Sequence, residues 1–283
     1  MTKKVGIIGV GLLGGALANR LAQQEWKVIG HDPSATDTDA LTMCNHATEL
    51  VEQCETVLLS LPTSEVVVSV IDLVKSAITD RHCFVDTTTG NPEDMEAIGK
   101  NLKELDANYL EANVAGSSKL AKNGKATLFL GGNKKLIHCY QDLLNALASK
   151  QFHVGPVGSA SRFKLVHNLI LGLNRAGLAE GLALAEALGF NASEALTILR
   201  ETPASSIAME AKGNKMAEGI YTPPQAKLAQ HLKDVRVIRR LADKAGARTP
   251  LTNAHQSLLE EAQSLGFGES DNAAIIEAFR HNL

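Results

Sequence analysis

Lys164 and Asn168 lie four residues apart in the segment GPVGSASRFKLVHN, which runs from residue 155 to residue 168. In a helix, side chains with this spacing share one face. Burial and the positive end of the helix dipole would both lower the pKa of a lysine in the first turn. Such a lysine can give or take a proton while an alcohol and a carbonyl interconvert, and Asn168 could hold the same oxygen. The segment alone is equally compatible with a surface lysine and a satisfied polar asparagine.

Three glycines near the start of the chain have the spacing G-x-G-x-x-G, namely Gly9, Gly11 and Gly14. They follow the apolar run Val5–Ile8 and precede a helical pattern at Leu12–Leu21. In this strand–turn–helix context, the first glycine permits the turn, the second lets the backbone approach a pyrophosphate, and the third lets helix and strand pack closely. The helix N-terminus then offers free N–H groups to phosphates. The pattern predicts a dinucleotide site.

Asp32 ends a second predicted strand, Trp26–His31, about twenty residues further along. A carboxylate at this position can bind the ribose hydroxyls of NAD and repels the 2′-phosphate of NADP. Pro33 follows, where an arginine would favour NADP, and Ser34 is the residue that weakens this argument. The sequence therefore favours NAD, with NADP less favoured.

The composition is that of an ordinary globular protein. The chain has 283 residues, 45% hydrophobic and 21% charged, with a formal net charge of −3. We find no basic stripe typical of nucleic-acid binding, no membrane span and no signal segment, so we expect a cytoplasmic protein. The four cysteines form no C-x-x-C pair, and no histidine has metal-ligand spacing. We therefore expect neither disulfides nor a metal.

The first half of the chain alternates short apolar runs with helical patterns, which predicts a mostly parallel sheet with helices on both faces. The expected strands are Val5–Ile8, Val28–His31, Thr56–Leu61, Cys83–Asp86, Tyr109–Ala112, Thr127–Leu130 and Phe152–Val154. Beyond Gly158 the pattern becomes entirely helical. We predict an α/β fold, in which a Rossmann-type doubly wound sheet (residues 1–161, NAD-binding) precedes an all-α domain (residues 162–283, substrate binding and dimerisation).

A long helix, predicted at Arg162–Leu188, joins the two domains. Its residues are apolar nearly all round, so we expect it to be buried on every face. It would lie either between the two domains or between subunits.

Several motifs, in this order, resemble the β-hydroxyacid dehydrogenases, which include 3-hydroxyisobutyrate dehydrogenase, tartronate semialdehyde reductase and the glyoxylate/succinic semialdehyde reductases. 6-Phosphogluconate dehydrogenase is a more distant relative. The similarity covers essentially the whole chain. It rests on GVGLLGGALANRL, SLPTSEVV (60–67), DTTTGNP (86–92), the 155–168 segment with Ala160 in place of a glycine, and HLKDVRVIRRLADKAG (231–246).

The resemblance implies site residues. The catalytic lysine falls on Lys164 and its asparagine on Asn168, while Lys233 and Asp234 fall near the cleft. The implied cofactor-binding residues are Gly9, Gly11, Leu12, Leu13, Gly14, Asp32, Leu61, Pro62, Val66, Thr88, Thr89 and Lys233. Lys233 is also a candidate for the substrate site, and His167, between Lys164 and Asn168, is a weaker catalytic candidate.

One motif departs from the family pattern. The substrate loop D-A-P-V-S-G-G appears here as EANVAGSS, so that Ala115 replaces the serine, Asn113 the proline and Glu111 the aspartate. Backbone N–H groups at Gly116, Ser117 and Ser118 can still form an anion nest, and a hydroxyl of either serine could replace the missing one.

These features predict an NAD-dependent oxidoreductase that transfers a hydride between the nicotinamide and a small 3-hydroxy acid or its semialdehyde. Lys164 would be the general acid/base, and Asn168 would orient it. The alternatives are an imine reductase, which usually lacks the lysine, and a dinucleotide-binding protein without turnover. The resemblance further implies a homodimer or homotetramer built on the helical half.

Overall fold

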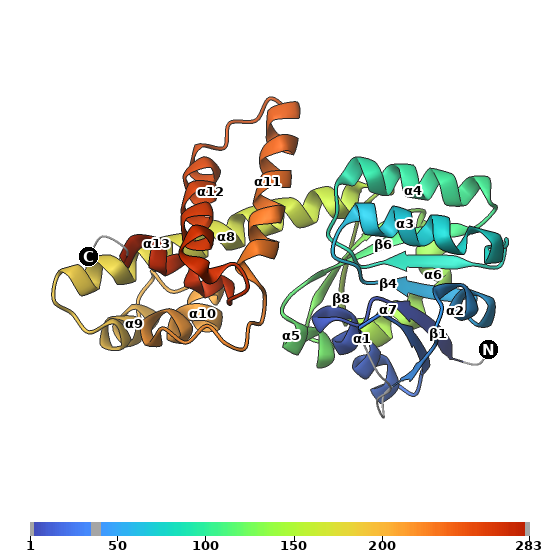
Figure 1. Cartoon of the computed structure of the whole chain (residues 1–283), viewed down its shortest axis with the longest axis horizontal. Helices are drawn as coiled ribbons and strands as arrows, with labels where there is room; N and C mark the ends of the chain where they lie inside the picture. Colours follow the sequence, from blue (N-terminus) through green and yellow to red (C-terminus); the bar gives the residue numbers. More distant parts are fainter. Residues whose placement is uncertain (1–2, 35–40, 281–283) are drawn as a thin grey trace. The chain divides into compact units, whose positions relative to one another are not determined.

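The computed structural model describes residues 3–34 and 41–280. The chain divides into two compact units, Met1–Lys164 and Leu165–Leu283. The division falls inside helix α8 (Ser159–Ala187), three residues after the boundary expected from the sequence. Figure 1 shows the sheet-containing N-terminal unit and the helical unit.

The N-terminal unit is built on a sheet whose described strands follow the order β3-β2-β1-β4-β5-β6-β7-β8. Their bounds are β1 Lys4–Ile8, β2 Lys27–His31, β3 Thr42–Met43, β4 Thr56–Leu59, β5 Cys83–Asp86, β6 Asn108–Ala115, β7 Thr127–Gly131 and β8 Lys150–Gly155. Pairing is parallel except between β6 and β7. The first six strands have the order of a doubly wound dinucleotide-binding fold, as predicted.

Helices cover both faces of this sheet (Figure 1). They are α1 Leu12–Gln23, α2 Ala47–Gln53, α3 Ser64–Val74, α4 Pro92–Glu104, α5 Ser118–Lys122, α6 Lys134–Cys139 and α7 Gln141–Leu147, with a 3₁₀ turn at Lys75–Ala77. Successive strand residues point to opposite faces. Thus Val57 and Leu59 belong to the core under α2, α3 and α4, whereas Leu58 belongs to the core under α1 and α7.

The helical unit contains the rest of α8 and the helices α9 Ala192–Arg200, α10 Ile207–Glu218, α11 Leu228–Lys244, α12 Pro250–Ala262 and α13 Glu277–Arg280. A π-helical turn, Gln263–Phe267, and a 3₁₀ turn, Asn272–Ile276, follow α12. Side chains cap several of these helices, because the first N–H groups of a helix lack partners within it. The Asn191 side chain accepts from the N–H groups of Ser193 and Glu194, and Ser206 accepts from Met209.

The expectation that α8 is buried on every face is wrong for the chain by itself. Leu178 and Leu182 pack into the core of the helical unit. On another side of the helix, Val166, Ile170 and Leu184 are each more than half exposed. An apolar helix face of this kind remains open for contact with another molecule.

The sequence also missed some strand boundaries. The two-residue strand β3 was not expected, β4 ends two residues before the predicted Leu61, and β6 extends beyond the predicted Ala112 to Ala115. Among the described residues, no helix combines the length and apolar character needed to cross a membrane.

Candidate functional site

The glycine loop between β1 and α1 has the geometry that its spacing predicts. Gly9 has a φ of +93°, and its N–H donates to the His31 carbonyl at 2.9 Å. A Cβ on Gly14 would clash with the Gly9 carbonyl oxygen, so the third glycine is required for packing. A Cβ on Gly11 would meet nothing within 4 Å, which leaves open space over the N-terminus of α1. The loop therefore fits a pyrophosphate lying against its backbone.

Asp32 holds this loop from the end of β2. One carboxylate oxygen accepts the Val10 N–H at 2.8 Å, and the other accepts the Ser34 N–H at 2.8 Å. These bonds fix a negative charge beside the glycine turn. Each oxygen keeps a further lone pair that can accept a hydrogen bond from a hydroxyl group.

Two other segments predicted to contact the cofactor lie together. The Leu61 N–H, after β4, donates to Thr88 Oγ1, after β5, at 3.1 Å. Pro62 and Val66 are exposed, Thr89 is half-buried and Thr88 is buried. The structure thus brings the loops after β1, β4 and β5 to the carboxyl edge of the sheet, where parallel α/β sheets bind ligands.

A buried carboxyl group, not predicted from the sequence as a site residue, supports the Thr88 loop. Asp86 accepts the Thr88 N–H at 2.8 Å with one oxygen and the Tyr109 hydroxyl at 2.8 Å with the other. Burial raises the pKa of Asp86 to about 6, although both hydrogen bonds act in the opposite direction. A signal was present in the sequence, since the aspartate opens the motif DTTTGNP.

The predicted substrate loop continues from β6 into α5. Gly116 has a φ of +146°, and the Ser117 hydroxyl oxygen accepts the Leu120 N–H at 3.3 Å as the cap of α5. Ser118 is half-buried at the first position of this helix. The two serines that sequence reasoning treated alike therefore differ, because Ser117 has a capping role.

Lys164 and Asn168 both lie on α8, four residues apart as predicted, and both are buried, with 8% and 9% exposure. Lys164 belongs to the N-terminal unit and Asn168 to the helical unit. A lysine is rarely so deeply buried unless its amine has a specific role or partner.

Within the helical unit, Asn168 binds the late K-D pair. Its Nδ2 donates to Asp234 Oδ2 at 3.0 Å, and Lys233 Nζ lies 3.0 Å from Asp234 Oδ1. His167 Nδ1 lies 3.1 Å from Asn168 Oδ1, so a proton on Nδ1 would be donated to that oxygen. Asp234, which the sequence placed near the cleft without a role, joins Asn168 to Lys233.

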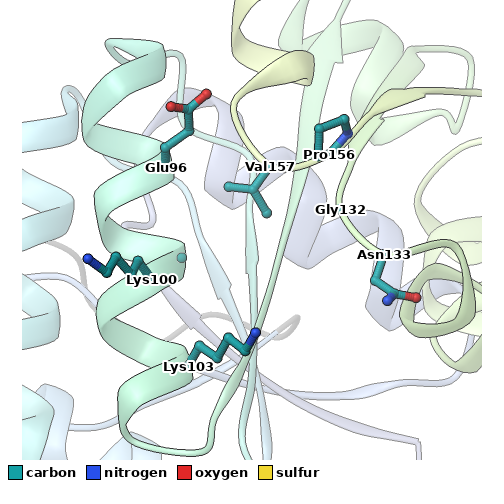
Figure 2. Close-up of a pocket in the computed structure, with 8 residues that line it drawn as sticks. Glu96, Lys100, Lys103, Gly132, Asn133, Pro156 and Val157 are labelled. Carbon is teal, nitrogen blue, oxygen red and sulfur yellow. The ribbon is translucent and has the colours of Figure 1, made fainter.

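A hollow of about 500 Å³ lies elsewhere on the N-terminal unit and contains none of the predicted site residues. Figure 2 shows it between α4, which carries Glu96, Lys100 and Lys103, and the segments that follow β7 and β8. Four of its lining residues are polar or charged, but none belongs to the predicted site, so we assign the hollow no role. A second hollow, of about 480 Å³, lies in the helical unit and includes Lys233 with Arg236, Arg239 and Arg240.

Among the described residues, no group of three or more His, Cys, Asp or Glu side chains is arranged so that it could hold a metal ion.

Comparison with known proteins matches both units. Residues 4–155 match the family model described as the NAD binding domain of 6-phosphogluconate dehydrogenase. Residues 158–279 match the one described as NAD-binding of NADP-dependent 3-hydroxyisobutyrate dehydrogenase.

Full-length relatives agree with these matches. The chain is 27% identical to glyoxylate/succinic semialdehyde reductase 1 of Arabidopsis thaliana, covering 98% of each. It is 27% identical to 2-(hydroxymethyl)glutarate dehydrogenase of Eubacterium barkeri, covering 98% of this chain and 94% of the relative. Its fold resembles that of 3-hydroxyisobutyrate dehydrogenase from Salmonella typhimurium, with a TM-score of 0.88 at 22% identity over 97% of this chain and 99% of the other.

Proposed function

Because the chain belongs to the β-hydroxyacid dehydrogenase family of NAD(P)-dependent oxidoreductases, we propose that it interconverts a small 3-hydroxy acid and its semialdehyde, with Lys164 as general acid/base. The observation that carries this proposal is the burial of Lys164 on α8, one turn from Asn168. Nicotinamide, when bound, supplies the hydride chemistry, while protein groups position the reactants and move the proton.

In this proposal, Lys164 Nζ accepts the proton of the substrate hydroxyl when the alcohol is oxidised, and it donates a proton to the carbonyl oxygen when the semialdehyde is reduced. Asn168 orients the reacting oxygen or the lysine. Its amide is itself held by Asp234 at 3.0 Å, which fixes the rotamer that it presents. Lys233, paired with the same carboxylate, adds a cation for the substrate or cofactor.

We propose NAD over NADP as the cofactor. The Asp32 carboxylate is held in place by the N–H groups of Val10 and Ser34, so its charge does not swing away from the end of β2. A 2′-phosphate brought there would meet this fixed negative charge. Neither Pro33 nor Ser34 offers a cation to compensate.

The substrate carboxylate is proposed to bind at the backbone N–H groups of Gly116, Ser117 and Ser118. Because the Ser117 hydroxyl oxygen already caps α5, the Ser118 hydroxyl is the better replacement for the serine that the family has at Ala115.

The test of this proposal is Lys164→Ala, assayed with a panel of short 3-hydroxy acids and semialdehydes using NAD(H) and NADP(H). We expect kcat to fall by about 100-fold or more while NAD binding, measured by calorimetry, persists. The matched control is Lys122→Ala, which removes an exposed lysine from α5. Near-normal turnover in the Lys164 variant would remove this lysine from the mechanism.

Two other functions are separated by the same assays. An imine reductase would oxidise NADH with cyclic imines and not with semialdehydes, but such enzymes usually lack the lysine. A non-catalytic dinucleotide-binding protein would bind NAD and turn over nothing in the panel. The altered loop EANVAGSS is the feature that favours this second alternative.

We further propose a homodimer or homotetramer built on the helical unit. The exposed apolar face of α8, which includes Ile170 and Leu184, supports this assembly, because apolar helix faces are commonly buried between subunits.

A further inference from the structure

Two buried polar side chains on β6, Glu111 and Asn113, have no role in the chemistry proposed above. They are 1% and 0% exposed. Since they are two residues apart on a strand, they point to the same face of the sheet. Each one binds a segment that carries a residue of the proposed site.

Glu111 caps the start of α8. Its Oε2 accepts the Gly158 N–H at 2.6 Å, and its Oε1 accepts both the Ser161 N–H at 3.1 Å and the Ser161 hydroxyl. The neighbouring strand makes room for this carboxylate, because a Cβ on Gly131 would clash with Oε2. A carboxylate at a helix N-terminus satisfies N–H groups that have no partner within the helix. Lys164 follows Ser161 by three residues, so the cap fixes the turn on which the lysine stands.

Asn113 binds the loop after β5. Its Nδ2 donates to the Thr88 carbonyl at 2.6 Å, and its Oδ1 lies 3.5 Å from Ser161 Oγ. Thr88 is also held by hydrogen bonds from the Leu61 N–H to its Oγ1 and from its own N–H to Asp86. Asn113 therefore joins the threonine loop to the strand that also holds α8.

The strand that makes these contacts is itself well fixed. β6 pairs with β5 on one side and with β7 on the other, and Asn113 pairs with Phe129 of β7. Three residues after Asn113 the same strand leads into Gly116, the first residue of the proposed carboxylate loop. One element thus sets the positions of the lysine turn, the threonine loop and the carboxylate loop.

We propose that Glu111 and Asn113 are positioning residues, which hold the Lys164 turn and the Thr88 loop in register for the reaction; this rests on the proposed function. A displacement of about 1 Å between reacting groups can lower the rate about 100-fold, so loss of the hydrogen bonds of Glu111 or Asn113 should slow the chemical step. Neither side chain is assigned contact with the substrate.

The test compares Glu111→Gln and Asn113→Ala with a core control, Val114→Ala. Gln keeps the shape of Glu111 but presents an NH₂ donor to N–H groups that need acceptors. Val114 is a buried residue of the same strand, pointing to the opposite face, where it belongs to a hydrophobic core. Its truncation destabilises the strand without breaking either tie.

We expect single-turnover hydride transfer to fall by about 10-fold or more in each polar variant, with KM and the NAD Kd within about threefold of the wild type. The control Val114→Ala should keep its transfer rate within about twofold of the wild type, even where it lowers Tm as much as the polar variants do. Equal rate losses in Val114→Ala and the polar variants would overturn the proposal, since general destabilisation would then account for them.

Amide hydrogen exchange separates this proposal from the proposed function. Glu111→Gln should speed exchange at residues 158–164, and Asn113→Ala at residues 87–91, whereas Val114→Ala should do neither. Unchanged exchange in both polar variants would overturn the positioning roles, whatever the substrate is. A failed activity panel, or a fully active Lys164→Ala, would instead overturn the proposed function.

Ser161→Ala serves if Glu111→Gln does not fold, because it removes only the hydroxyl and leaves both backbone bonds to the carboxylate. Its transfer rate should fall by about threefold, with a loss of Tm no larger than that of Val114→Ala. No fall in this variant would count against Glu111.

Discussion

The N-terminal unit buries carboxyl groups among several donors, whereas the helical unit buries two bases that have few acceptors. Asp86 and Glu111 are each 1% exposed, and each accepts at least two hydrogen bonds. Arg175 and His255 are 4% and 2% exposed. In the described part of the chain, Arg175 Nε and both His255 ring nitrogens have no hydrogen-bond partner.

This difference separates two uses of buried polarity. A satisfied acid ties several backbone segments together and defines their geometry, while a poorly satisfied base costs stability and ties little. The contrast has exceptions in the helical unit, where Lys212 and Asp271 form a buried pair at 2.7 Å and the buried Asp234 binds both Asn168 and Lys233. The two groups to which we assign positioning roles, Glu111 and Asn113, are both buried and hydrogen-bonded.

Asp86→Leu should have the largest effect on stability. It leaves the Tyr109 hydroxyl and the Thr88 N–H buried without their acceptor, so we expect a loss of about 4 kcal/mol in the free energy of unfolding. Asp86→Asn is the matched control, because its oxygen accepts from Thr88 and its NH₂ donates to Tyr109. Urea titrations of both variants measure the difference. Equal losses would show that the hydrogen bonds are not what Asp86 contributes.

The two units should respond to pH in opposite directions. The Asp86 pKa is about 6 against an ordinary 3.8, so the folded state binds this proton more tightly. Its contribution to stability is present below pH 3.8 and is lost as pH rises through 6. Burial and the charge of Arg175 lower the pKa of His255 from 6.5 to about 4. Burial of the neutral His255 ring therefore lowers the free energy of unfolding increasingly as pH falls from 6.5 through 4. Each effect amounts to about 3 kcal/mol.

In the wild type these two slopes oppose each other between about pH 4 and 6. Asp86→Asn should make the free energy of unfolding rise more steeply with pH across this window. His255→Leu should make it fall with pH relative to the wild type. Urea unfolding at half-unit pH steps measures both slopes, and variants that leave the wild-type slope unchanged would contradict the assigned pKa values.

The sequence predicts those features of the fold whose signals lie within a few neighbouring residues. The glycine loop and the strands around it were predictable, because G-x-G-x-x-G and short apolar runs act over a few residues. The extension of β6 to Ala115 was not, since Asn113 is typical of a loop and only pairing with the antiparallel partner β7 makes residues 113–115 strand. β3 was missed because two residues carry no periodicity.

The contacts that fix the site lay further out of reach. Glu111 and Ser161 are 50 residues apart, and Asn168 and Asp234 are 66 apart. Glu111, Asn168 and Asp234 belong to motifs that the sequence shows, but their hydrogen-bond partners could not be predicted. Hydrogen bonds between distant segments follow from the topology of the sheet and the helices and leave no local pattern.

Arg175→Met should stabilise the helical unit. The guanidinium is buried, which lowers its pKa to about 10, and Asp271 keeps Lys212 as its partner when Arg175 is removed. Replacing such a group by an apolar chain of similar size should gain about 1–2 kcal/mol. Arg175→Lys keeps the buried charge and should give no gain. Loss of stability in the Met variant would contradict this prediction and would show that Arg175 stabilises the helical unit.

Gly177→Ala gives the smallest effect and sharpens the assembly proposal. A Cβ there would meet nothing within 4 Å, so the monomer should gain about 0.5–1 kcal/mol from the better helix former. The control on the same helix is Gly172→Ala, whose Cβ would lie 2.6 Å from His255 Cε1 and should lose that gain to crowding.

The assembly proposal is tested by measuring association and Tm at several protein concentrations. If the exposed side of α8 packs against a second copy, the new methyl group at position 177 crowds that contact, and sedimentation equilibrium should show weaker association than in the wild type. The Tm should then rise at low concentration, where the single chain dominates, and the gain should shrink at high concentration. A gain that does not depend on concentration would place the subunit contact on another face of the helical unit, because an open glycine within an interface cannot accept a side chain without cost.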